Sequence, residues 1–272
     1  MGERPVLRLS IMHTLRDTLN LLLREWRFFV TIIIGPVLII TAANLTARIA
    51  TQKAAGFVLA ILTFVVLIFS GVRIAVCCHR FILMGEQPRS FLQECRWQTR
   101  DTWFAFYAFA IYLFAWLFVF MAVLGGAALS PFLQFLPKWV LILLFALGAI
   151  GMWLLFSYLM GRLSLVLPVT AIDQRPEKDW ALWAWNRSEG NEWPLMFLLG
   201  INPSLGWVLL DSSTGIMIEQ AKQSSALLAV PIYGFSWGLY FLATVFQVAV
   251  LSLSLKELSP RAGEVEVLAT IS

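Results

Sequence analysis

Residues 139–160 read WVLILLFALGAIGMWLLFSYLM, and no side chain in this run is charged. At a rise of about 1.5 Å per residue, a helix of roughly 20 apolar residues crosses the roughly 30 Å hydrocarbon core of a bilayer. The run therefore predicts a membrane-spanning helix.

The composition of the whole chain agrees with this run. Of 272 residues, 60% are apolar and 13% are charged, whereas soluble domains have about 45–50% and about 25%. Too little polar sequence remains to cover a particle in water, so apolar surface has to face lipid. Soluble classes are excluded, and so are collagen-like, disordered and disulfide-rich classes, because Gly and Pro are few and there are three Cys.

Six stretches are predicted to cross the membrane, which makes the chain an all-α polytopic membrane protein with a single integral membrane domain over residues 1–272. The predicted spans are 28–45, 54–76, 103–124, 139–167, 195–210 and 227–255. The fifth is the weakest, because Gly200, Asn202 and Pro203 interrupt it. We expect a broken or tilted helix there.

The positions of Lys and Arg predict the orientation, because these residues resist translocation. With six spans, 16 of the 20 Lys and Arg residues fall on one side. Both termini, including the tail 256–272, are therefore expected in the cytoplasm. Omitting the fifth span fits the charges less well. We expect no cleavable signal peptide, because the first apolar run follows an Arg-rich segment and has no small-residue cleavage site.

The net charge of +4 and the isoelectric point of about 9.1 express this one-sided basicity. It predicts contact with anionic lipid head groups, at about 1 kcal/mol per favourably placed basic residue. Nucleic acid is not an expected partner, because the basic residues are spread over four segments.

Residues 1–27 are predicted to hold a cytoplasmic amphipathic helix. Apolar residues recur there at steps of three and four: Ile11, Met12, Leu15, Leu19, Leu22, Leu23 and Trp26. An acidic residue lies one or two positions before a Trp at the start of the first, third and fifth spans. We predict these tryptophans, Trp26, Trp103 and Trp193, as interface anchors. One interpretation is three tandem hairpins, each preceded by an interfacial helix. The alternative is convergence, since membrane hairpins commonly acquire Trp and Arg at their edges.

Two motif-bearing segments follow the second and fourth spans. They read HRFILMGEQPRSF (79–91) and GRLSLVLPVTAIDQRPEKDWALWAWNRSEGNEWPL (161–195). The chain resembles the bacterial six-helix membrane proteins of the YciC-like group, which is related to the membrane domain ahead of some glycerophosphodiester phosphodiesterases. The matching positions are Arg162, Ser164, Pro168 with one spacing variation, Ala171 and Gly190-Asn191-x-Trp193.

This resemblance implies six helices, cytoplasmic termini and a place in the bacterial inner membrane. It implies no phosphodiesterase activity, because that chemistry needs His and carboxylates around a metal ion and the chain has only His13 and His79. Glu192 and Pro194 depart from the pattern on either side of Trp193, so the start of the fifth span is less certain.

Four arginines near the cytoplasmic ends of spans are candidates for binding lipid or another anion: Arg73, Arg80, Arg162 and Arg187. The alternative reading of Arg73 and Arg162 is topological anchoring, since an arginine near a helix end can extend to the interface. Pairing with Glu86 or Asp173 also fits the sequence.

Prolines mark candidate hinges at Pro36, Pro168 and Pro203. They are read either as structural kinks or as breaks that line a solute path. Gly234 and Gly238 predict close helix packing, within the chain or in a dimer. Gln247 is read as a hydrogen-bonding partner of a neighbouring helix, or as a substrate ligand.

No catalytic residues, cofactor or metal site are predicted. The adjacent Cys77 and Cys78 point about 100° apart on a helix and lack zinc-ligand spacing. We find no nucleophile with its base, and no carboxylate within a predicted span, which argues against proton-coupled transport. The leading hypothesis is a non-enzymatic inner-membrane protein that engages anionic lipid or a protein partner through its cytoplasmic helices. The alternative is a transporter or channel for a small or amphipathic solute.

Overall fold

The computed structural model describes residues 8–49, 53–86, 96–129, 131, 135–173, 179–223 and 226–258. Every regular element of more than one turn in these ranges is a helix, which confirms the all-α prediction. The helices are α1 (Ile11–Arg24), α2 (Trp26–Ile49), α3 (Lys53–Met84), α5 (Thr99–Leu129), α6 (Lys138–Leu163), α7 (Val166–Ala171), α8 (Trp180–Arg187), α9 (Glu192–Leu195), the π-helix η2 (Met196–Ile201), α10 (Asn202–Gln223) and α11 (Ala226–Leu258).

Several of these helices are long and apolar enough to cross a membrane, so the chain is a membrane-embedded helical protein. Within the described residues, five such segments correspond to five of the six predicted spans: Trp26–Thr46, Phe57–Met84, Thr99–Ala128, Lys138–Ala171 and Ala229–Leu258. The sixth prediction corresponds to a shorter apolar helix, Glu192–Ile201, which continues into α10.

The predicted break in the fifth span is a π-helical turn. Pro203 has no backbone N–H, and its ring would collide with the carbonyl of Leu199 in a regular α-helix. The wider η2 turn ends directly before Asn202-Pro203 and accommodates this proline. The chain therefore stays helical past residue 210 to Gln223, and α10 contains Asp211.

The fourth predicted span, 139–167, is shorter as a continuous helix. α6 ends at Leu163, and the chain turns before α7 begins at Val166. Pro168 cannot donate to the carbonyl of Ser164, and that carbonyl instead accepts from Leu167 N at 2.9 Å. The proline thus favours a helix boundary here. In contrast, Pro36 lies inside the uninterrupted α2, and α3 extends beyond residue 76 to Met84.

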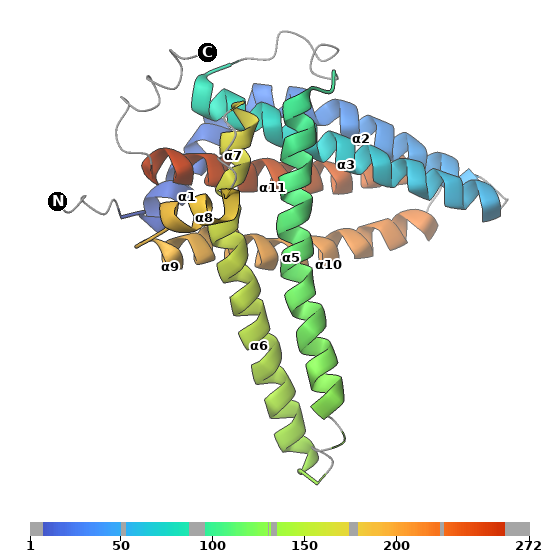
Figure 1. The fold of residues 1–272 in the computed structure, drawn as a ribbon. Coiled ribbons are helices and arrows are strands. Elements are labelled where there is room, and N and C mark those ends of the chain that lie inside the picture. Colours follow the sequence, from blue (N-terminus) through green and yellow to red (C-terminus); the bar gives the residue numbers. More distant parts are fainter. Residues whose placement is uncertain are drawn as a thin grey trace.

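α11 is the central helix of the fold. It packs against α2 and α3 on one side and α10 on the other, as Figure 1 shows. Half of the residues in its most apolar stretch are buried within the protein, compared with 6% in the most apolar stretch of Lys138–Ala171. Consecutive long helices also pair, as α2 with α3, α5 with α6 and α10 with α11.

The α5–α6 hairpin runs crosswise to α2, α3, α10 and α11 in Figure 1. Its outer half exposes large apolar side chains on both helices, including Trp116, Phe120, Trp139 and Ile142. Such side chains suit a hydrocarbon environment, as expected for a membrane-embedded segment.

α6 and η2 approach each other closely at their backbones. A Cβ atom added at Gly161 of α6 would lie 2.7 Å from the backbone oxygen of Leu195, and one added at Gly200 of η2 would overlap the backbone of Ser157. Small residues allow helices to pack this closely in membranes. This contact fixes the position of η2 and α10.

Two of the three expected amphipathic helices fall within the described residues. α1 precedes α2, and its buried face includes Thr14 and Thr18. Leu9 N donates to Asn191 Oδ1 at 2.7 Å, which ties the start of α1 to the start of α9. The short α8 precedes the α9–η2–α10 helix. The segment ahead of α5 includes residues 87–95, which lie outside the described residues.

Candidate functional site

An apolar groove with a volume of about 650 Å³ lies between α1, α10 and α11. This volume is within the range of about 300–1,000 Å³ that is usual for ligand pockets. Its walls are Leu19, Leu22, Leu23 and Trp26 on α1 and at the start of α2, Leu198, Asn202, Pro203, Gly206 and Leu210 on η2 and α10, and Leu239, Leu242, Ala243, Phe246, Gln247 and Val250 on α11. The groove therefore has an apolar interior with two amide side chains.

An exposed arginine, Arg27, borders this groove. The guanidinium carbon of Arg27 lies 5.7 Å from the ring centroid of Trp26, which is one of the groove walls. Arg16 lies three residues before the wall residue Leu19, so the two side chains share one side of α1. Both arginines are exposed. An apolar groove bordered by a cation matches a ligand with an acyl chain and an anionic head.

Three residues singled out in the sequence meet in this groove. Trp26 was predicted as an interface anchor, Pro203 as a hinge and Gln247 as a hydrogen-bonding partner or ligand, and all three line the groove. The structure brings them together because α1 and α10 both pack on α11. Their positions in the sequence, far apart, gave no sign of this.

Arg73 forms a buried ion pair. Its Nη1 atom lies 2.6 Å from Oδ2 of Asp101, and the two side chains are 8% and 0% exposed. The same carboxylate oxygen accepts from the backbone N–H of Gln98 at 2.6 Å. Arg73 thereby joins α3 to the first turn of α5.

Arg80 joins the end of α3 to the end of α7. It binds Glu86 bidentately at 2.5 and 2.7 Å, and its Nη1 lies 2.9 Å from Oδ2 of Asp173. Arg100 contacts the same oxygen at 2.9 Å. Asp173 has a positive φ of 63°, which places its carboxylate between the two arginines. The two acids proposed as partners for Arg73 or Arg162 thus pair with Arg80.

Arg162 uses its whole guanidinium group within the protein. It donates to Ser188 Oγ, Tyr158 Oη and the carbonyl of Trp185, each at 2.7 Å. Its guanidinium carbon also lies 3.8 Å from the ring centroid of Trp185. These contacts fasten α8 to the end of α6, and Arg187 lies half-buried at the end of the same α8.

Replacing Arg162 with lysine is expected to lower the free energy of unfolding by about 1–3 kcal/mol, although the charge is kept. Lysine lacks the planar guanidinium group, so it cannot donate to three fixed acceptors while stacking on an indole ring. Thermal unfolding of the purified protein in detergent would measure the loss. Arg8→Lys, at an exposed position, is the matched control. An equal loss of stability in both variants would contradict the role of the guanidinium contacts of Arg162.

Several other sequence candidates lie away from the groove. Trp193 is largely exposed, whereas Trp103 is half-covered beside Phe106 and Tyr107. Pro168 is buried in α7. Gly234 faces α2, since a Cβ added there would lie 4.0 Å from Thr41 Oγ1, whereas one added at Gly238 would have no heavy atom within 4 Å.

A second cavity of about 800 Å³ lies between α5, α6 and α8. Its walls are apolar and include Leu113, Leu117, Leu163 and Trp180. The groove along α1 is the stronger candidate, because only its walls combine apolar surface with polar side chains that can orient a ligand.

Metal-ligating side chains gather elsewhere. His79 is fully buried, and its Nδ1 lies 2.7 Å from Ser252 Oγ; Cys77 and Cys78 directly precede it in α3. In the described residues one group of three potential ligands is close enough to hold an ion, and it comprises His13, Asp17 and Glu257.

Comparison with known proteins found no protein-family model, no curated protein and no solved structure that matches this chain. The likeness to the YciC-like group therefore remains a prediction from the motifs. Arg27, which borders the groove, and Arg16, on the same side of α1 as the wall residue Leu19, were not singled out in the sequence. Their signal was their place on the helix, next to Leu19 and Trp26.

Proposed function

We propose that this protein is a non-enzymatic protein of the bacterial inner membrane that binds an anionic phospholipid at the cytoplasmic face. An acyl chain occupies the groove between α1, α10 and α11, and the head group contacts Arg16 and Arg27. In this proposal both termini are cytoplasmic, and three hairpins with their interfacial helices form the membrane domain.

One observation carries the proposal: Arg27 stands over Trp26, and Trp26 is a wall of an apolar groove. The cation and the apolar surface are therefore adjacent, as they have to be for one amphipathic molecule to use both. By contrast, Arg73, Arg80 and Arg162 are engaged by partners within the protein. Their contacts support helix packing, so the head-group role is assigned to the α1 side.

Arg27→Gln is expected to weaken the retention of phosphatidylglycerol about fivefold, corresponding to about 1 kcal/mol for one favourably placed cation. Native mass spectrometry of the protein released from bilayer nanodiscs would measure the bound fraction. Arg24→Gln is the matched control, because Arg24 is exposed and close by in the sequence but its charge is paired: its Nε lies 3.3 Å from Glu25 Oε1. Equal losses in the two variants would show general attraction to the membrane surface in place of a site.

A change inside the groove tests the acyl-chain part separately. Ala243 is a half-buried groove wall, and Ala243→Phe adds bulk without altering charge. Loss of bound phospholipid from this variant, with the fold retained, supports the groove. Unchanged binding contradicts it.

The second candidate function is transport of an amphipathic solute. It is favoured by Asn202, Pro203 and Gln247, which bring polar groups and a π-helical turn to one apolar groove. Irregular helices often line the sites of transporters. Protein-dependent movement of a fluorescent phospholipid across proteoliposome bilayers would favour transport over static binding.

A further inference from the structure

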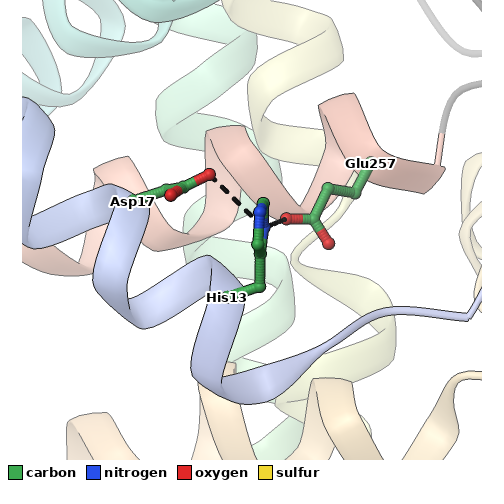
Figure 2. Close-up of side chains that lie close together, drawn as sticks. All are labelled: His13, Asp17 and Glu257. Carbon is green, nitrogen blue, oxygen red and sulfur yellow. Dashed lines mark hydrogen bonds and ion pairs between the residues drawn. The ribbon is translucent and has the colours of Figure 1, made fainter.

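The two ends of the described chain meet at a cluster of three potential metal ligands, shown in Figure 2. His13 and Asp17 are one turn apart on α1, so both side chains leave the same face of the helix. Glu257 comes from the last turn of α11. The ligand atoms of all three residues lie within 4.8 Å of one another.

The imidazole of His13 faces two acceptors with one nitrogen. Its Nδ1 lies 3.3 Å from Asp17 Oδ2 and 3.3 Å from Glu257 Oε1. A ring nitrogen carries at most one hydrogen, and both distances are longer than the usual range of about 2.7–3.2 Å for an N–H···O bond. One hydrogen atom on Nδ1 therefore cannot make a good hydrogen bond to both carboxylates. In addition, two carboxylates beside one imidazole leave net negative charge to be neutralised.

A tetrahedral metal ion fits the two distances from His13 Nδ1, and the two carboxylate oxygens lie within 4.8 Å of each other. With metal–nitrogen and metal–oxygen bonds of about 2.0–2.1 Å, two ligand atoms of such an ion stand about 3.3 Å apart. Both measured distances from Nδ1 equal this edge. One imidazole and two carboxylates form a donor set that suits zinc and related divalent ions.

The surroundings of Glu257 support a ligand role. Thr14 Oγ1 lies 3.2 Å from Glu257 Oε1 and 2.9 Å from the carbonyl of Ser10, so its one hydrogen can be donated to either oxygen. Because Thr14 is fully buried, its hydroxyl stays next to this carboxylate, as outer partners of metal ligands commonly do. The His13, Asp17 and Glu257 side chains are 64%, 44% and 29% exposed, so an ion and a water ligand have access.

We propose that His13 Nδ1 and the carboxylates of Asp17 and Glu257 bind one divalent transition-metal ion of the zinc type, with water completing the coordination. The ion clamps α1 to the end of α11. This site is independent of the lipid groove, and it goes beyond the sequence analysis, which predicted no metal site. His13 and Glu257 are 244 positions apart, so no local motif could reveal it.

Titration of the purified full-length protein with ZnCl₂ in a calorimeter tests the site. Wild-type protein is expected to bind one equivalent that His13→Gln, Asp17→Asn and Glu257→Gln each lose. Thr14→Val, which removes only the supporting hydroxyl, is expected to lower the affinity about tenfold. Thermal unfolding is expected to shift upward with Zn²⁺ in the wild type and not in His13→Gln.

Glu189→Gln is the matched control, because it removes an exposed carboxylate from the turn after α8. It is expected to keep the wild-type equivalent. Absence of Zn²⁺ binding to the wild type overturns the proposal. It is also overturned if His13→Gln binds as the wild type does, since the ion would then sit at a cysteine or another site. The three ligand residues are exposed or half-buried, so gel filtration is expected to show folded variants.

Discussion

Asp101→Ala is expected to lower the free energy of unfolding by about 3–5 kcal/mol, because it leaves the guanidinium of Arg73 buried without its counter-charge. Arg73 is 8% exposed and lies 2.6 Å from the carboxylate of Asp101, which is itself fully buried. The same change removes the acceptor of Gln98 N at the start of α5. Reversible unfolding in mixed micelles would measure the difference.

A double replacement separates the cost of the uncompensated charge from general damage. Arg73→Leu combined with Asp101→Leu removes both charges and is expected to recover most of the stability lost in Asp101→Ala, since apolar replacements of buried pairs are often neutral. Glu25→Ala is the control for an ion pair at the surface, because its partner Arg24 is 84% exposed, and its cost is expected below about 1 kcal/mol. A cost for Asp101→Ala no greater than that of Glu25→Ala would refute the importance of burial.

Gly200→Ala is expected to destabilise the protein by about 3 kcal/mol, at the upper end of overpacking effects. A Cβ atom at this position would overlap the backbone and side chain of Ser157 on α6, and a backbone can move aside only by separating the helices. The same measurement of unfolding in micelles would show the loss. We expect Gly161→Ala to behave similarly, because its Cβ would meet the backbone of Leu195.

Gly215→Ala provides the comparison on the same helical segment. A Cβ atom at Gly215 has no heavy atom within 4 Å, so the substitution is expected to be neutral or stabilising by up to about 1 kcal/mol from helix propensity. If Gly200→Ala unfolded at the same denaturant concentration as Gly215→Ala, the close crossing of η2 and α6 would be wrong.

Much of the secondary structure could be predicted because the signals are local. Apolar runs long enough to span hydrocarbon identified α2, α3, α5, α6 and α11. The three- and four-residue steps of leucines predicted α1. Helix ends were less accurate, because they depend on individual hydrogen bonds, such as the one that turns the chain between α6 and α7.

The candidate sites could be predicted only in part. Trp26, Pro203 and Gln247 were each singled out for a separate reason, but their meeting in one groove depends on how α1 and α10 pack on α11. The acid that neutralises Arg73 lies on another helix, and Asp173, which pairs with Arg80, lies after α7, so a count of charges along the chain does not assign these partners. Ser157 and Gly161, where α6 meets η2, stand at the small-x-x-x-small spacing that is common in membrane helices, and this spacing does not identify the partner helix.

By itself, the sequence determined that this chain is a helical membrane protein with a strongly uneven distribution of cations. That conclusion needs only the balance of apolar and charged residues, since hydrocarbon excludes unpaired charge wherever it lies in the chain. Only the tertiary structure decided which arginines are engaged within the protein, which one borders an apolar groove, and that His13 meets Glu257. These are contacts between distant residues, and their formation depends on the packing of whole helices.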